Sequence, residues 1–143
     1  MKGPDREERA LAQLVKVARA KIDELSARLA DLETAKASAE SSLDWLDQAV
    51  RTEEAAARRT AAAPLDFMRY LAGADAKRKS LQSTRDTLAE EIGSIREALN
   101  EAFAEAKKLE HLFSINRKGL AAREQKTQAA SADDLHAMRR GRR

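Results

Sequence analysis

Apolar residues recur alternately every four and every three residues along two long stretches of this 143-residue chain. The first stripe comprises Leu11, Val15, Ala18, Ile22, Leu25, Leu29, Leu32, Lys36, Ala39, Leu43, Leu46, Val50, Glu53 and Ala57. The second stripe comprises Phe67, Leu71, Ala74, Arg78, Leu81, Arg85, Leu88, Ile92, Ile95, Leu99, Ala102, Ala106, Leu109, Phe113, Asn116 and Leu120. A repeat of 3.5 residues keeps one face of a helix against a partner helix. Each stretch therefore requires a long helical neighbour, and the nearest one is the other stretch.

The repeat fails between Arg59 and Leu65, where Pro64 cannot continue a helix because it lacks a backbone donor. Asp66 is placed to act as the N-cap of a second helix. The sequence predicts an all-α fold, a long antiparallel two-helix coiled-coil hairpin in a single domain over residues 1–143. We expect the first helix over about 6–59, a turn over about 60–65 and the second helix over about 66–125.

Residues 126–143 are expected to form a flexible basic tail. With the turn near residue 63, position i lies opposite position 128 minus i, so residues after about 123 have no helix of this chain to lie on. Five of the 18 residues from 126 to 143 are basic and two are acidic, whereas the two longer segments are balanced in charge. The ending RRGRR is either an electrostatic handle for nucleic acid, acidic lipid or an acidic protein, or a solvated end.

The composition points away from enzymes and compact globular proteins. It is 43% hydrophobic, 36% charged and 3% aromatic, which is typical of long helices and coiled coils. The chain has no cysteine, and Asp133 with His136 gives two metal-ligand types without a third. No phosphate-binding loop or nucleophile elbow occurs. We expect no enzymatic activity, no cofactor and no metal, and with no signal peptide or membrane-spanning run we expect a cytosolic protein.

Polar residues interrupt the stripes, and two interpretations remain open. Arg78 is placed to form a staggered ion pair with Glu53, while Lys36 and Arg85 can extend along the stripe and keep their charges in water. These residues either set the register of the helices or loosen their packing.

The few aromatic residues also allow two interpretations. Phe67, Met68 and Tyr70 follow the turn, where the facing helix offers mainly alanines. They either close the end of the core or present a contact surface. Trp45 flanks the first stripe, and its role as packing or as partner contact is likewise open.

The run EALNEAFAEAKKLEHLF, followed by REQK and DDL, on a coiled coil of this length resembles the FliJ family of the bacterial flagellar export apparatus. This signal lies within residues 96–135. Where members of the family pass quickly from a lysine or glutamine run to Asp-Glu, this chain inserts TQAASA before Asp133 and Asp134. The resemblance implies a non-enzymatic stalk, similar to the central stalk of rotary ATPases, that connects the flagellar export ATPase ring to the export gate protein.

The resemblance also implies two contact sites, and export chaperones as further candidate partners. It places the protein in the cytoplasm, peripheral on the cytoplasmic side of the inner membrane and attached only through its partners. The export-gate contact would comprise Phe67, Met68, Tyr70, Leu71, Ala74 and Arg78. In the family a phenylalanine, a leucine and an alanine at i, i+4 and i+7 contact the gate, and Phe67, Leu71 and Ala74 have this spacing. The ATPase contact would comprise Arg117, Lys118, Arg123, Lys126, Arg139 and Arg140.

Three alternative functions remain at this stage. The chain could be the stalk protein of a virulence type III secretion system or a self-associating scaffold. It could also be a nucleic-acid-binding hairpin acting through its basic tail. Intermixed charges along both long segments argue against a basic stripe, so we expect no nucleic-acid partner.

Overall fold

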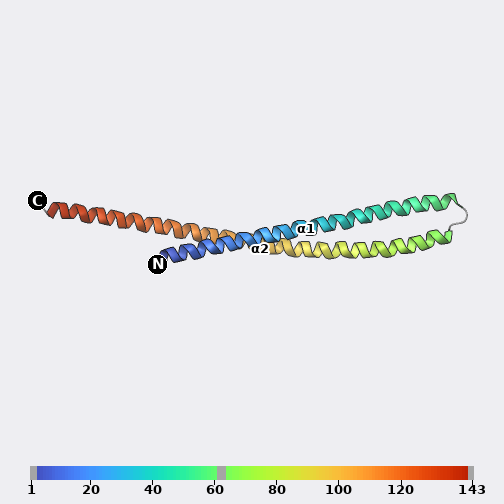
Figure 1. The fold of residues 1–143 in the computed structure, drawn as a ribbon, viewed down its shortest axis with the longest axis horizontal. Coiled ribbons are helices and arrows are strands. Elements are labelled where there is room, and N and C mark those ends of the chain that lie inside the picture. The colour runs from blue at the N-terminus through green and yellow to red at the C-terminus, as the bar shows by residue number, and fades with distance from the viewer. Residues whose placement is uncertain (1–2, 61–63, 142–143) are drawn as a thin grey trace. The chain divides into compact units, whose positions relative to one another are not determined.

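The computed structural model describes residues 3–60 and 64–141, which form two helices packed against each other (Figure 1). Helix α1 spans Gly3–Arg59 and helix α2 spans Pro64–Gly141. Within these ranges there is no strand. The chain divides into two units, and each contains a segment of both helices. Unit 1 comprises Met1–Asp23 and Asn100–Arg143, and unit 2 comprises Glu24–Leu99.

The burial of side chains follows the two stripes. In the second stripe every member is buried or half-buried, and in the first stripe only Glu53 is exposed. The buried residues of the described chain all belong to the stripes: Ala39, Leu46, Ala74, Ile92, Ala102 and Ala106. Among the described residues no large side chain is completely buried. The predicted helical faces are therefore confirmed, and both units are held together mainly by half-buried leucine, isoleucine and valine side chains.

Helix α2 begins two residues earlier than the sequence predicts. Pro64 is its first residue, and Asp66 lies inside the first turn instead of preceding it as an N-cap. Proline is favoured at this position because the first amides of a helix have no intrahelical acceptor and its fixed φ suits a helix. Residues 64 and 65, expected in the turn at about 60–65, thus belong to α2, and residues 61–63 lie outside the described residues.

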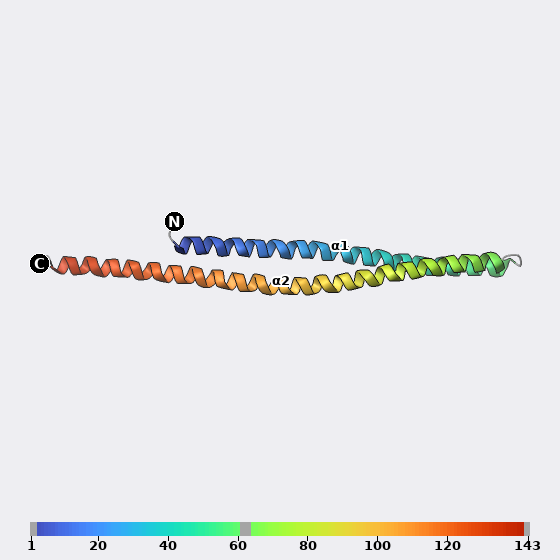
Figure 2. The same cartoon turned by 90° about the horizontal axis from the view of Figure 1, so that it is seen from below.

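Helix α2 also continues beyond residue 125, where the sequence predicts a flexible tail. It remains helical to Gly141, although every side chain from 121 to 141 is exposed. Alanine, glutamine, lysine and glutamate, which have high helix propensity, and the absence of proline favour helix continuation here. A flexible tail is thus not confirmed. In both views of unit 1 the last turns of α2 lie beyond the beginning of α1 (Figure 2). We refer to residues 121–141 as the α2 extension.

Ion pairs join α1 and α2 within each unit. In unit 1, Arg117 Nε lies 3.4 Å from a carboxylate oxygen of Glu8, and Arg19 Nε donates a 2.7 Å hydrogen bond to Glu110. In unit 2, Arg96 lies 3.2 Å from Glu33. The two pairs of unit 1 follow opposite orders along the helices. Glu8 of α1 pairs with Arg117 of α2, whereas Arg19, further along α1, pairs with Glu110, which is earlier on α2. The arginine of each pair is largely exposed, so each pair contributes at most about 1 kcal/mol.

Candidate functional site at the start of α2

The start of α2 carries the largest exposed apolar side chains of unit 2 other than Trp45. Leu65 is 73% exposed and Met68 is 67% exposed, whereas Phe67, Tyr70 and Leu71 are half-buried. The cluster therefore divides by face. Phe67 and Leu71 continue the stripe that packs on α1, and Leu65 and Met68 are left to contact solvent or a partner.

A hollow of ≈ 200 Å³ lies where the start of α2 meets the end of α1. Phe67 and Tyr70 line it from α2, opposite Ala56 and Ala57 of α1. Because alanine is the largest apolar residue that α1 supplies here, the two aromatic rings are only half covered. The rest of the lining is polar: Glu53, Thr60 and Asp66.

A second hollow of ≈ 380 Å³ shares Tyr70 with the first and is centred on Trp45. The indole is 64% exposed, and the Lys77 ammonium lies 6.0 Å from its ring centroid, at the outer limit of a cation–π contact. Gly73 lies in the lining and leaves it open, because a Cβ added there would meet nothing within 4 Å. The remaining lining residues are Leu46, Arg69 and Ala74.

The Trp45 hollow was not predicted from sequence. The sequence indicates only that Trp45 flanks the first stripe, and the pairing rule places it opposite residue 83. The structure instead places the Lys77 ammonium 6.0 Å from its ring centroid, and Tyr70 lines the same hollow. The sequence feature that could have indicated this hollow is Gly73, which lies next to the second stripe on α2 and four residues before Lys77. The structure thus extends the candidate surface from α2 onto α1.

Two further residues of the expected gate contact, Ala74 and Arg78, contact other parts of this chain. Ala74 is only 6% exposed and packs within the stripe. Arg78 donates hydrogen bonds of 2.9 Å to Asp47 on α1 and 2.9 Å to Asp75 on its own helix. The predicted ion pair of Arg78 with Glu53 is therefore wrong. Glu53 lies about one and a half turns further along α1 than Asp47, and its side chain is exposed.

The residues expected to contact an ATPase lie near the end of α2 in unit 1. Arg117 is held by Glu8, and its guanidinium lies 5.7 Å from the Phe113 ring centroid. The other five are exposed and follow one another along the helix: Lys118, Arg123, Lys126, Arg139 and Arg140. Asp133 and Asp134 interrupt this series, so the end of α2 is a mixed surface with an excess of positive charge.

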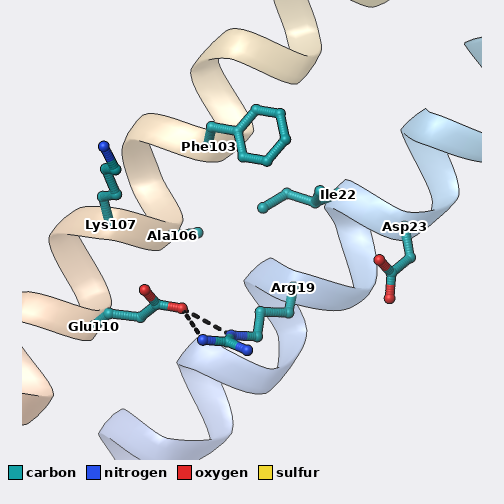
Figure 3. A pocket seen from close by; sticks show the side chains of 7 residues that line it. All are labelled: Arg19, Ile22, Asp23, Phe103, Ala106, Lys107 and Glu110. Atoms are coloured by element: carbon teal, nitrogen blue, oxygen red, sulfur yellow. Dashed lines mark hydrogen bonds and ion pairs between the residues drawn. The ribbon is translucent and has the colours of Figure 1, made fainter.

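Unit 1 contains a further hollow of ≈ 390 Å³ between its two helix segments. Figure 3 shows Phe103 from α2 pointing toward Ile22 of α1 across this space, with the Arg19–Glu110 ion pair at one end. Asp23, Ala106 and Lys107 complete the lining. The hollow is thus lined by both apolar and charged side chains.

Within residues 3–60 and 64–141, no group of three histidine, cysteine, aspartate or glutamate residues could hold a metal ion. In the same ranges, neither helix has a segment that is both long and apolar enough to cross a membrane. The surfaces described above expose apolar, aromatic and charged side chains.

Comparisons with known proteins do not identify the chain. No protein-family model matches it, and searches of curated proteins and of solved structures give no significant match.

Proposed function

We propose that this protein is a non-enzymatic helical connector that binds different partners at the two ends of α2. The observation that supports this most directly is the chemical contrast between those ends. The start of α2 has Leu65 and Met68 at 73% and 67% exposure, next to half-buried Phe67 and Tyr70. The extension carries four basic residues, Arg123, Lys126, Arg139 and Arg140, against three acidic ones, Glu124, Asp133 and Asp134. An apolar aromatic surface and a basic helix suit partners of different chemistry.

The proposal includes an antiparallel arrangement of α1 and α2. The pairs Arg19–Glu110 and Glu8–Arg117 in unit 1, and Glu33–Arg96 and Asp47–Arg78 in unit 2, support it. Their residue numbers sum to between 125 and 129, as expected for a hairpin that reverses near residue 63. The α2 extension is then the part for which α1 is too short, and we propose that it frays when alone and becomes ordered on a partner.

The most specific form of the proposal is a stalk of the bacterial flagellar export apparatus, acting between the export ATPase ring and the export gate. This assignment rests on the resemblance of residues 96–135 to the FliJ family and on the spacing of Phe67, Leu71 and Ala74. Export chaperones are further candidate partners, and the membrane would be reached only through the gate. The same architecture would serve the stalk of a virulence secretion system.

The partners can be identified by capture from the native cell. The purified chain serves as bait for cytosolic and membrane fractions, and captured proteins are identified by mass spectrometry. Enrichment of an export ATPase or an export-gate subunit supports the connector. Recovery of only the bait itself or nucleic acid contradicts it and leaves the resemblance as one between two coiled coils.

The site assignment has its own test. Replacing both Phe67 and Leu71 with alanine is expected to abolish binding to the captured gate protein while circular dichroism shows unchanged helicity. Because both side chains also pack on α1, a second variant replaces the exposed Met68 with glutamate, which leaves the stripe intact. Leu135→Glu is the matched control, since Leu135 is 59% exposed but lies in the extension. Unchanged gate affinity in both site variants would exclude this surface.

A further inference from the structure

Unit 1 exposes a group of apolar side chains that neither end of the proposed connector uses. Leu14 and Val17 of α1 are 49% and 56% exposed, and Leu112 and Ile115 of α2 are 43% and 53% exposed. Together with exposed Ala10, they come from short stretches of the two helices that the Glu8–Arg117 and Arg19–Glu110 pairs bracket. We call these five residues the unit 1 apolar face.

The heptad register places all five residues on one side of unit 1. With the stripe residues at positions a and d, Leu14 and Leu112 occupy position g, and Ala10, Val17 and Ile115 occupy position c. Positions g and c lie on the same flank of a helix. When two helices run antiparallel, as proposed above, their g flanks adjoin on one face of the pair. Arg19 and Glu110 occupy position e and therefore form their ion pair on the opposite face, as do Glu33 and Arg96 in unit 2.

The core of unit 1 buries little apolar surface in the single chain. Its only buried hydrophobic residues among those described are Ala102 and Ala106. The larger stripe residues next to the face, Leu11, Val15 and Phe113, are half-buried. Contiguous apolar surface of this kind marks interaction sites, because removing it from water is favourable by about 25 cal/mol per Å².

The charges that border the face match those of a second copy. Glu7 and Lys21 also occupy position g on α1, each seven residues from Leu14 and on opposite sides of it. Consider a twofold axis that passes at the level of Leu14, lies in the plane of the face and runs perpendicular to the helices. This axis places α1 of one copy antiparallel on α1 of the other. Glu7 of each copy then lies opposite Lys21 of the other.

The same axis has a similar effect on α2. Leu112 lies opposite Leu14, since their numbers sum to 126. Glu105 is seven residues before Leu112 and Lys118 is six residues after it, so each carboxylate lies near an ammonium of the other copy. All four charged side chains are exposed in the single chain. A twofold contact requires a surface to complement itself, and this one does so in both apolar pattern and charge.

We propose that a second copy of this chain docks on the unit 1 apolar face and forms an antiparallel four-helix segment. Each helix in this segment has antiparallel neighbours, which is the usual packing of up-and-down four-helix bundles. The face belongs to unit 1 and the gate contact at residues 67–78 to unit 2, so the dimer does not depend on the connector function. A failure of one proposal therefore leaves the other standing.

Sedimentation equilibrium on the full-length chain over a range of concentrations tests the contact. The wild type is expected to pass from monomer to dimer as its concentration rises. Leu14→Glu and Leu112→Glu should each raise the dimer dissociation constant at least about tenfold, because both copies then bury an unpaired carboxylate. Phe103→Glu is the matched control. Phe103 is 46% exposed in the same unit but occupies position e, so this change should leave the dissociation constant within about twofold.

Charge exchange tests the direction of docking. Glu7→Lys and Lys21→Glu each set like charges opposite one another twice per dimer, and each should weaken association about fivefold. Combining them restores opposite charges and should restore the wild-type constant. A monomer at every concentration overturns the proposal, as does a dimer unaffected by the Leu14 and Leu112 changes. A dimer that both single charge variants weaken but the combined variant does not rescue overturns the antiparallel twofold.

Discussion

At the scale of single residues, the glycines of α2 are sites where the sequence departs from helix preference without a steric reason. A Cβ added to Gly93 would meet nothing within 4 Å, and its backbone has no positive φ. Glycine inside a helix costs about 1 kcal/mol relative to alanine because it loses more backbone freedom on folding. These positions are therefore local weak points of α2.

Gly93→Ala is expected to raise the free energy of unfolding by up to about 1 kcal/mol, since alanine restricts the unfolded chain and fits the helix. Urea denaturation followed by circular dichroism measures this change. Ala89→Gly is the reverse control at an exposed position one turn earlier and should lower stability by a similar amount. A loss of stability in Gly93→Ala would show that the backbone at this position is not an ordinary helix.

Asn116 is the second residue where local preference and position disagree. It occupies the second stripe between Phe113 and Leu120, and its Oδ1 atom is buried without a hydrogen-bond partner. A buried polar atom left unpaired costs about 1–3 kcal/mol. A polar residue at such a position can still be useful, because it disfavours alternative registers.

Asn116→Leu should therefore increase the free energy of unfolding by about 1–3 kcal/mol. Asn100→Leu, at an exposed position in the same unit, should change it by less than about 0.5 kcal/mol. Urea titrations of both variants and the wild type provide the comparison. If Asn116→Leu proved less stable than the wild type, the amide would have to be satisfied in solution.

At the scale of helices, the sequence predicts the buried face of each helix better than it predicts the ends of the helix or its contacts with the other helix. The stripes were predictable because a 3.5-residue period is written in the residues themselves, and all 16 members of the second one are at least half-buried. The α2 extension was expected to be a tail because it lacks a neighbouring helix, but residues such as Ala121 and Ala129 retain helix propensity without a neighbour. In the α2 extension the helix therefore continues without burial of its side chains.

Contacts between the helices depend on register, which a single pairing rule fixes only to about one turn. That uncertainty is enough to exchange Glu53 for Asp47 as the partner of Arg78. The Trp45 hollow escaped prediction for a related reason. The pairing rule places Trp45 opposite residue 83, whereas the hollow that it lines includes Tyr70, Gly73 and Lys77. The exposed apolar surface at the start of α2 was thus predictable, whereas its continuation onto α1 was not.

Proline substitutions distinguish the paired part of α2 from its extension. Ala104 and Ala130 are both exposed alanines on α2, but only Ala104 lies where α1 packs alongside. Proline within a helix removes one hydrogen bond and clashes with the preceding turn, at a cost of about 3 kcal/mol. Ala104→Pro should lower the global free energy of unfolding by about that amount. Ala130→Pro should leave it within about 0.5 kcal/mol, because the extension makes no packing contribution to lose. Equal effects in urea denaturation would mean that the extension is packed in solution.

At the scale of the whole molecule, the two units differ in what they bury. Unit 2 holds Leu46 and Ile92 at 4% and 5% exposure, whereas the buried residues in the described part of unit 1 are alanines. Since the free energy of local opening depends on buried apolar area, unit 1 should open more readily than unit 2. The apolar face lies on this weaker unit, which links folding of the unit to self-association.

Hydrogen exchange can measure that link directly. In the dilute monomer, amides of residues 103–116 should exchange faster than those of 81–95, because fewer large side chains must separate to expose them. As the protein concentration rises into the range where dimers form, exchange over 103–116 should slow, since a second copy stabilises the folded form by mass action. Residues 81–95 provide the internal reference and should not change. In Leu112→Glu the concentration dependence should disappear while the fast exchange of the dilute protein remains. Equal protection of the two segments at low concentration would contradict the difference in burial, and protection independent of concentration would contradict the docking of a second copy on unit 1.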